Sequence, residues 1–134
     1  MRAALLLPFL LLACRSSSTS ESVGPQRPVV TRTTAVRAWE MWQQGRCLGS
    51  LVRFEDPDDP TRGYYSVRAR EGHEIGLVDL QGRAWRYHAH QPEPEWLGTT
   101  TVLDGARRIL GGTASAELVE VDVAQLKDVL ERLR

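Results

Sequence analysis

Two histidines, His88 and His90, are separated by one residue and form the clearest metal-binding pattern in the chain. If they lie on a β-strand, alternate side chains point to the same face, so both imidazoles could address one ion. A metal site needs three or four ligands of matched geometry, and two exposed histidines on a solvent face are the ordinary alternative. Further ligands would have to come from carboxylates or a histidine elsewhere, such as His73, Asp79, Glu93 or Glu95. His88 and His90 are therefore weak metal candidates, and we expect no cofactor.

Nucleophilic catalysis finds less support. The chain has no Gly-x-Ser-x-Gly pattern, which exposes the serine of many hydrolases at a strand-to-helix turn. Cys47 could act as a nucleophile with a histidine base, but nothing in the sequence brings the two together. Its surroundings, from Arg46 to Phe54, have the pattern of a strand, which indicates a buried structural cysteine. We therefore expect no enzymatic activity.

Large aromatic residues are numerous for this chain, which has 4 Trp and 3 Tyr. Trp39 and Trp42 are an odd number of positions apart, so on one regular strand they face opposite sides and at least one is exposed. Exposed Trp beside Arg is typical of a contact surface for a protein or a glycan. The alternative for each ring is core filling. The candidate interaction surface consists of Trp39, Trp42, Pro92, Pro94 and Trp96.

The N-terminus has the pattern of an export signal. Arg2 precedes an apolar run from Ala3 to Leu12, which is too short for a membrane-spanning helix of about 20 residues. Its length suits a secretory signal, whose apolar region has about 7–15 residues. The run ends in Leu-Leu-Ala-Cys at residues 11–14, which resembles the lipobox of bacterial lipoproteins. An ordinary signal peptide with an incidental cysteine, or a buried N-terminal strand, is the alternative.

The resemblance implies a location in the bacterial cell envelope. Residues 1–13 would be a signal peptide, and Cys14 would become the first mature residue and carry the acyl chains, palmitate among them. Two or more acyl chains give lasting membrane attachment, whereas one gives only marginal binding. Arg15 stands where an aspartate retains enterobacterial lipoproteins at the inner membrane, so the resemblance implies the outer membrane, on its periplasmic or surface face.

The remaining chain divides into a linker and one domain. Residues 14–36 are rich in Ser, Thr and Pro, and we expect them to form a disordered linker because they can bury little apolar surface. Residues 37–134 have the size of a single small globular domain. Lys+Arg and Asp+Glu both number 17, so no basic patch indicates nucleic-acid binding. With Cys14 acylated, Cys47 has no internal disulfide partner, and the domain depends on its hydrophobic core.

Short apolar segments separated by turn residues indicate an antiparallel meander. The residues Gln44-Gly45 separate the runs 38–43 and 46–55, as in a hairpin, and the Pro and Asp residues of 56–63 favour a loop. A single helical turn is expected at 104–111, ended by Gly111. Further strands are expected at 64–70, with Tyr65, Val67 and Ala69 on one side, and at 75–79, 84–90, 96–103 and 117–121.

The C-terminus has the pattern of an amphipathic helix. Asp122 stands at an N-cap position, with Gln125 three residues later as in a capping box. Apolar residues follow at helical spacing, at Val123, Leu126, Val129, Leu130 and Leu133. We expect this stripe to pack on the sheet, with docking to a partner as the alternative. The predicted fold class is therefore α+β, mostly β: a small antiparallel sheet of about five to seven strands covered by a C-terminal helix.

These observations predict a membrane-anchored envelope lipoprotein with a non-catalytic binding or scaffolding domain. Its partner would be an envelope protein or a glycan. The alternative is a small-molecule or metal-binding module that uses the face of His88 and His90. A minor envelope hydrolase, or an inhibitor of one, is a third possibility.

Overall fold

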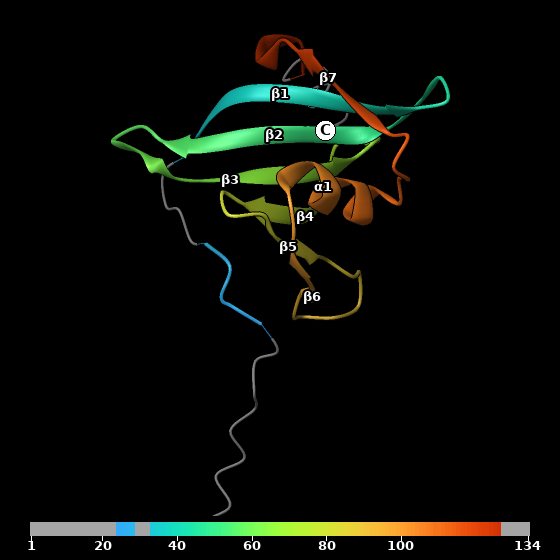
Figure 1. Cartoon of the computed structure of the whole chain (residues 1–134). Helices are drawn as coiled ribbons and strands as arrows, with labels where there is room; N and C mark the ends of the chain where they lie inside the picture. The colour runs from blue at the N-terminus through green and yellow to red at the C-terminus, as the bar shows by residue number, and fades with distance from the viewer. Residues whose placement is uncertain (1–23, 29–32, 127–134) are drawn as a thin grey trace, which may run out of the picture.

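A computed structural model of the protein describes residues 24–28 and 33–126. Within these ranges, seven strands form one antiparallel sheet and a short helix lies on one of its faces (Figure 1). The mostly β α+β class predicted from the sequence is confirmed. No helix within the described ranges is both long enough and apolar enough to cross a membrane. The elements are β1 (Thr34–Gln43), β2 (Arg46–Asp56), β3 (Asp59–Ala69), β4 (Glu74–Asp79), β5 (Arg83–Arg86), β6 (Glu95–Thr99), α1 (Val102–Leu110) and β7 (Glu117–Val121).

The strand order is β6-β5-β4-β3-β2-β1-β7, so the first six strands form the predicted meander. The last strand, β7, pairs with β1, and β6 and β7 are the two edges of the sheet. Helix α1 is part of the connection from β6 to β7, and it packs on the strands between them (Figure 1). One connection therefore joins the two edges and covers part of a face.

The turns show where local sequence rules hold. Gln44 and Gly45 both have positive φ (50° and 72°), the backbone of a two-residue hairpin turn, and the predicted β1–β2 hairpin is confirmed. The loop predicted at 56–63 is shorter, because β2 continues to Asp56 and β3 begins at Asp59. Asp56 Oδ1 still accepts the N–H of Asp58 at 2.9 Å, as expected for a tight turn.

The predicted strand 96–103 is also shorter. Strand β6 ends at Thr99, and Thr101 is the N-cap of α1, its Oγ1 accepting the N–H of Asp104 at 3.1 Å. The single helical turn predicted at 104–111 is thus a helix of nine residues, which ends at Gly111 as expected, with φ 71°.

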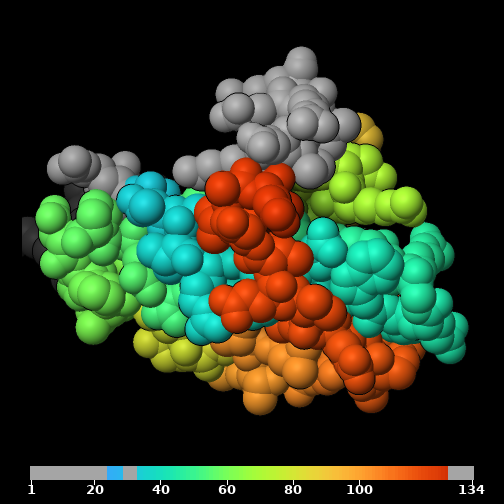
Figure 2. Space-filling view, turned by 90° about the horizontal axis from the view of Figure 1, so that it is seen from above, coloured from blue at the N-terminus to red at the C-terminus, as the bar shows by residue number. Residues whose placement is uncertain are grey.

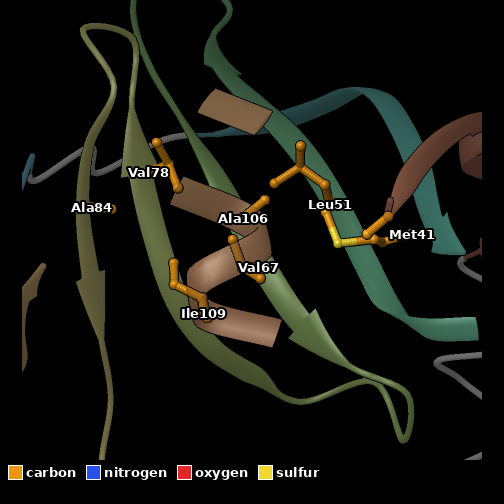
Figure 3. Packing of buried hydrophobic residues seen from close by; sticks show 8 residues of the cluster. Met41, Leu51, Val67, Val78, Ala84, Ala106 and Ile109 are labelled. Carbon is orange, nitrogen blue, oxygen red and sulfur yellow. The ribbon is translucent and has the colours of Figure 1, made fainter. Parts of the chain in front are cut away.

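The core lies between α1 and the sheet. One buried side chain from each of five neighbouring strands packs toward Ala106 and Ile109 of α1 (Figure 3). Tyr65 and Val67 lie on this side of β3, as their alternation predicts. The five buried strand residues are Met41, Leu51, Val67, Val78 and Ala84, none more than 2 % exposed.

Helix α1 approaches the sheet closely because facing positions lack a Cβ atom. A Cβ added at Gly49 would lie 2.6 Å from Leu110 Cδ2, and one at Gly76 would lie 2.7 Å from Ile109 Cγ2. On the helix, a Cβ at Gly105 would lie 3.1 Å from Val78 Cγ2. The glycines therefore leave the room that the Leu110 and Ile109 side chains occupy.

The chain then passes to the opposite face of the sheet. In Figure 2 the red segment that follows α1 crosses β1 and ends on the side away from the orange helix. The predicted N-cap is confirmed, because Asp122 Oδ1 accepts the N–H of Ala124 at 2.9 Å and residues 123–126 are helical. The later positions of the predicted apolar stripe, Val129, Leu130 and Leu133, lie outside the described residues.

The substitution Gly76→Ala tests the close approach of α1. Its methyl group would meet the Trp85 carbonyl oxygen at 2.6 Å and Ile109 Cγ2 at 2.7 Å, and overpacking costs about 1–3 kcal/mol. Gly105→Ala is the matched control, because its methyl group would make a looser contact with Val78. The higher helix propensity of alanine, about 1 kcal/mol better than that of glycine, offsets the cost of that contact. In urea unfolding we expect a lower free energy of unfolding for Gly76→Ala and little change for Gly105→Ala. Equal stability of Gly76→Ala and the wild type would contradict the packing.

Candidate functional site

The two histidines do not lie on a strand. Strand β5 ends at Arg86, so the strand predicted at 84–90 is wrong beyond that residue, and the alternation argument for His88 and His90 fails. His88 Nε2 lies 2.5 Å from Glu95 Oε2, whereas His90 is exposed in a turn. Among the described residues, no group of three or more His, Cys, Asp or Glu side chains is arranged to hold a metal ion.

The five residues of the predicted interaction surface are not brought together. Trp39 and Trp42 face opposite sides of β1, as their spacing predicts, and Trp42 is 37 % exposed with its Nε1 donating to Glu40. Trp96 packs against Trp85, with ring centroids 5.3 Å apart. Pro92 and Pro94 lie in the loop between β5 and β6. The structure therefore separates this candidate surface into three places.

Trp39 instead belongs to a cluster of alternating aromatic and arginine side chains. Its ring centroid lies 6.0 Å from that of Tyr65, and the Arg37 guanidinium lies 5.0 Å from the Trp39 centroid. The Arg53 guanidinium lies 5.5 Å from the Tyr65 centroid, and its Nη1 donates to the Tyr65 hydroxyl at 3.1 Å. We call Arg37, Trp39, Arg53 and Tyr65 the arginine–aromatic surface.

The strand register places these four residues side by side. Arg37 of β1 is opposite Arg53 of β2, which is opposite Tyr65 of β3. They share the face that carries α1, but the strands extend well beyond the helix toward the β2–β3 turn (Figure 1). The helix therefore leaves this end of the face uncovered.

Two glutamates hold the guanidinium groups in place. Arg37 forms two hydrogen bonds with Glu120 of β7, at 3.0 and 2.9 Å, and Arg53 Nε lies 2.8 Å from Glu55 Oε1. The hydrogen bonds between Arg37 and Glu120 raise the pKa of the arginine and lower that of the glutamate. Each guanidinium group is thus paired with a carboxylate while it lies over an aromatic ring. Trp, Tyr and Arg are the side chains most enriched at the centres of protein interfaces.

A cavity of about 220 Å³ lies on the opposite face, beside the N-terminal end of β2. Cys47 is half-buried there, and its Sγ lies 3.6 Å from the Gly49 carbonyl oxygen. Burial raises the pKa of the thiol, so it is a poor nucleophile at neutral pH. The other lining residues are Glu40, Gly49, Ser50, Ala69, Arg70, Gly72, Val121, Gln125 and Leu126.

Comparison of the chain with protein-family models, with curated proteins and with solved structures gives no match in any of the three. The assignment of the site therefore depends on the geometry of the arginine–aromatic surface and of the cavity. Of the four residues in that surface, sequence reasoning singled out only Trp39. The neighbouring Arg37, two residues earlier, was an available signal, because side chains at that spacing share a face of a strand.

Alkylation by iodoacetamide tests the state of the Cys47 thiol, in a Cys14→Ser background that leaves one thiol. Because burial raises its pKa, the thiolate forms only at higher pH than in the unfolded chain, and the rate of alkylation should rise at correspondingly higher pH. The same protein in urea is the control. A folded-state midpoint at or below that of the unfolded chain would contradict the assignment and would favour a reactive cysteine.

Proposed function

We propose that the protein is a bacterial lipoprotein of the cell envelope, anchored through acylated Cys14, whose folded domain binds a protein partner without catalysis. The Leu-Leu-Ala-Cys sequence at residues 11–14 supports the anchor, and Arg15 after it supports the outer membrane, on either its periplasmic or its surface face. The arginine–aromatic surface carries the binding function, because it gathers Trp, Tyr and Arg side chains on a part of the sheet that helix α1 leaves uncovered.

The chemistry of this surface favours a protein over a glycan. A sugar ring stacks on a bare aromatic face, whereas Trp39 and Tyr65 each carry a guanidinium over the ring. Cation–aromatic pairs of this kind, built from Arg, Trp and Tyr, are typical of protein contact centres. The balancing glutamates, Glu55 and Glu120, add acceptors at the rim.

The side chains that could act in catalysis form ion pairs and hydrogen bonds with their neighbours, which supports a non-catalytic role. His88 pairs with Glu95, and the buried Asp79 pairs with Arg83 and also accepts the N–H groups of Gln81 and Arg83. The thiol of Cys47 has a raised pKa. Each of these described groups is therefore engaged by a neighbour or is a weak nucleophile, which supports binding without catalysis.

Small-molecule binding is the second candidate function, and the cavity beside Cys47 is the observation that favours it. Glu40 and Arg70 supply opposite charges to its lining, and Ser50 and Gln125 supply hydrogen-bonding groups. Ala69, Val121 and Leu126 supply apolar surface, so a small molecule with both polar and apolar parts fits this lining. This candidate replaces the face of His88 and His90, which lacks a common strand.

The substitution Cys14→Ala tests the anchor. Without the acylated cysteine, the domain should move from the membrane fraction to the soluble fraction, and incorporation of a palmitate analogue should be lost. Cys47→Ala, which removes the other cysteine, is the matched control and should remain in membranes. Unchanged membrane retention of Cys14→Ala would contradict the proposal.

Photocrosslinking in cells tests the binding surface. Val36 is 41 % exposed beside Arg37, so a photoreactive side chain there should give a discrete crosslinked protein, whereas one at exposed Gln81 should not. Arg37→Ala should lower the yield several-fold, because truncating an interface arginine often costs more than about 1 kcal/mol.

Two controls separate the surface from the cavity. Arg62→Ala changes an exposed arginine elsewhere and should leave the crosslink unchanged. Cys47→Leu reduces the cavity and should also leave it unchanged. A crosslink that is lost in Cys47→Leu and kept in Arg37→Ala would assign binding to the cavity instead.

A further inference from the structure

Residues 24–28, part of the predicted linker, lie against the folded domain, and we call them the strap. Gly24 contacts Trp96 of β6: a Cβ added there would lie 2.7 Å from Trp96 Cγ. The Arg27 guanidinium lies 5.2 Å from the ring centroid of Tyr87, just after β5. The strap therefore meets the domain at the β5–β6 end of the sheet, as the blue segment in Figure 1 shows.

The contacts of the strap suit its sequence. Gly24 has φ of 102°, a conformation that disfavours other residues, and it faces a ring that is itself packed on the buried Trp85. Burial raises the pKa of Tyr87 to about 12, and Glu74 adds to the increase while Arg27 opposes it. Strand β1 then begins at Thr34, three residues before the predicted start of the domain.

The strap limits how far the domain can lie from an anchor at Cys14. At about 3.5 Å per residue, the chain from Cys14 to Gly24 spans at most about 35 Å. Without the strap contacts, the chain from Cys14 to Thr33 would span up to about 65 Å. The contacts therefore shorten the reach by nearly half and bring the chain into the domain at β6.

We infer that the anchored domain is held with edge strand β6 toward the lipid bilayer and with the arginine–aromatic surface of β1–β3 away from it. This orientation rests on the proposed acylation of Cys14. Neighbouring strands are about 4.8 Å apart, so β1 lies about 24 Å from β6 across the sheet.

The side chains at the β6 end indicate that the linkage, not attraction to lipid, sets this orientation. Glu93 and Glu95 are exposed there, the nearby His88 is paired with Glu95, and the exposed Arg108 donates to the Leu97 carbonyl of β6. This mixture of charges forms no basic cluster of the kind that binds the anionic surface of a bilayer. The β6 end is thus a surface that faces lipid without inserting into it.

Energy transfer from the protein to labelled lipid tests the orientation. The full acylated chain, with Cys47→Ser, would carry a fluorophore at Thr99→Cys on β6 or at Val119→Cys on β7, both exposed positions at opposite edges. In phosphatidylcholine vesicles with an acceptor lipid, we expect transfer several-fold higher from position 99 than from position 119. Equal transfer from the two positions in vesicle-bound protein would overturn the orientation and leave the anchor intact.

A strap variant tests the cause of the orientation. The double substitution Gly24→Ala/Arg27→Ala removes both strap contacts, so transfer from the two positions should converge while the protein stays bound to vesicles. Gln26→Ala is the matched control, because this exposed side chain lies within the strap, and it should keep the difference. A difference that survives in the double variant would overturn the role of the strap.

Hydrogen exchange in the soluble Cys14→Ala chain tests the strap without lipid. Pro25 and Pro28 carry no amide hydrogen, so the readout is the Gln26 amide, which should exchange several-fold more slowly than in the Gly24→Ala/Arg27→Ala variant. Equal exchange rates would overturn the strap contacts. A wild-type chain that is not acylated and does not bind vesicles would instead overturn the proposed function, and the orientation with it.

Discussion

The close packing of α1 on the sheet is the constraint from which the other features follow. Gly49 and Gly76 on the strands leave the room that the Leu110 and Ile109 side chains occupy, and Ala106 of the helix is fully buried. At 1.5 Å per residue, the nine residues of α1 extend about 13 Å, whereas strands β2 and β3 of 11 residues extend about 36 Å. A helix of this length covers only part of the face, and the arginine–aromatic surface occupies the part that is left.

Local rules predicted the fold where the signal lies within a few residues. The two-residue turn at Gln44 and Gly45, the Asp122 cap and the alternation around Val67 are of this kind, because each depends on backbone geometry that the residue itself favours. The length of α1 was underestimated, since its first turn depends on the Thr101 cap and its stability on contacts with distant strands.

The error at His88 and His90 has a different cause. Alternation in the sequence continues past Arg86, but a strand continues only while a partner supplies hydrogen bonds. Arg86 is opposite Glu95, the first residue of β6, so β6 offers no partner beyond this point, and on the β4 side one backbone hydrogen bond follows, from the Tyr87 N–H to the Ile75 carbonyl at 2.9 Å. The sequence of one strand does not indicate where the neighbouring strand begins. The shared strand predicted for His88 and His90 from alternation alone was wrong for that reason.

The arginine–aromatic surface depends on the register between strands as well. A bulge between Ala35 and Arg37 changes the pairing of β1 with β2, so that Arg37 lies opposite Arg53 on the face of Trp39. The same meander that builds this surface on β1–β3 sends β6 to the far edge, where the strap contacts Trp96. The proposed anchor and the proposed binding surface therefore lie at different ends of one sheet. A strap across β1 would instead place the surface beside the bilayer and restrict the approach of a protein partner.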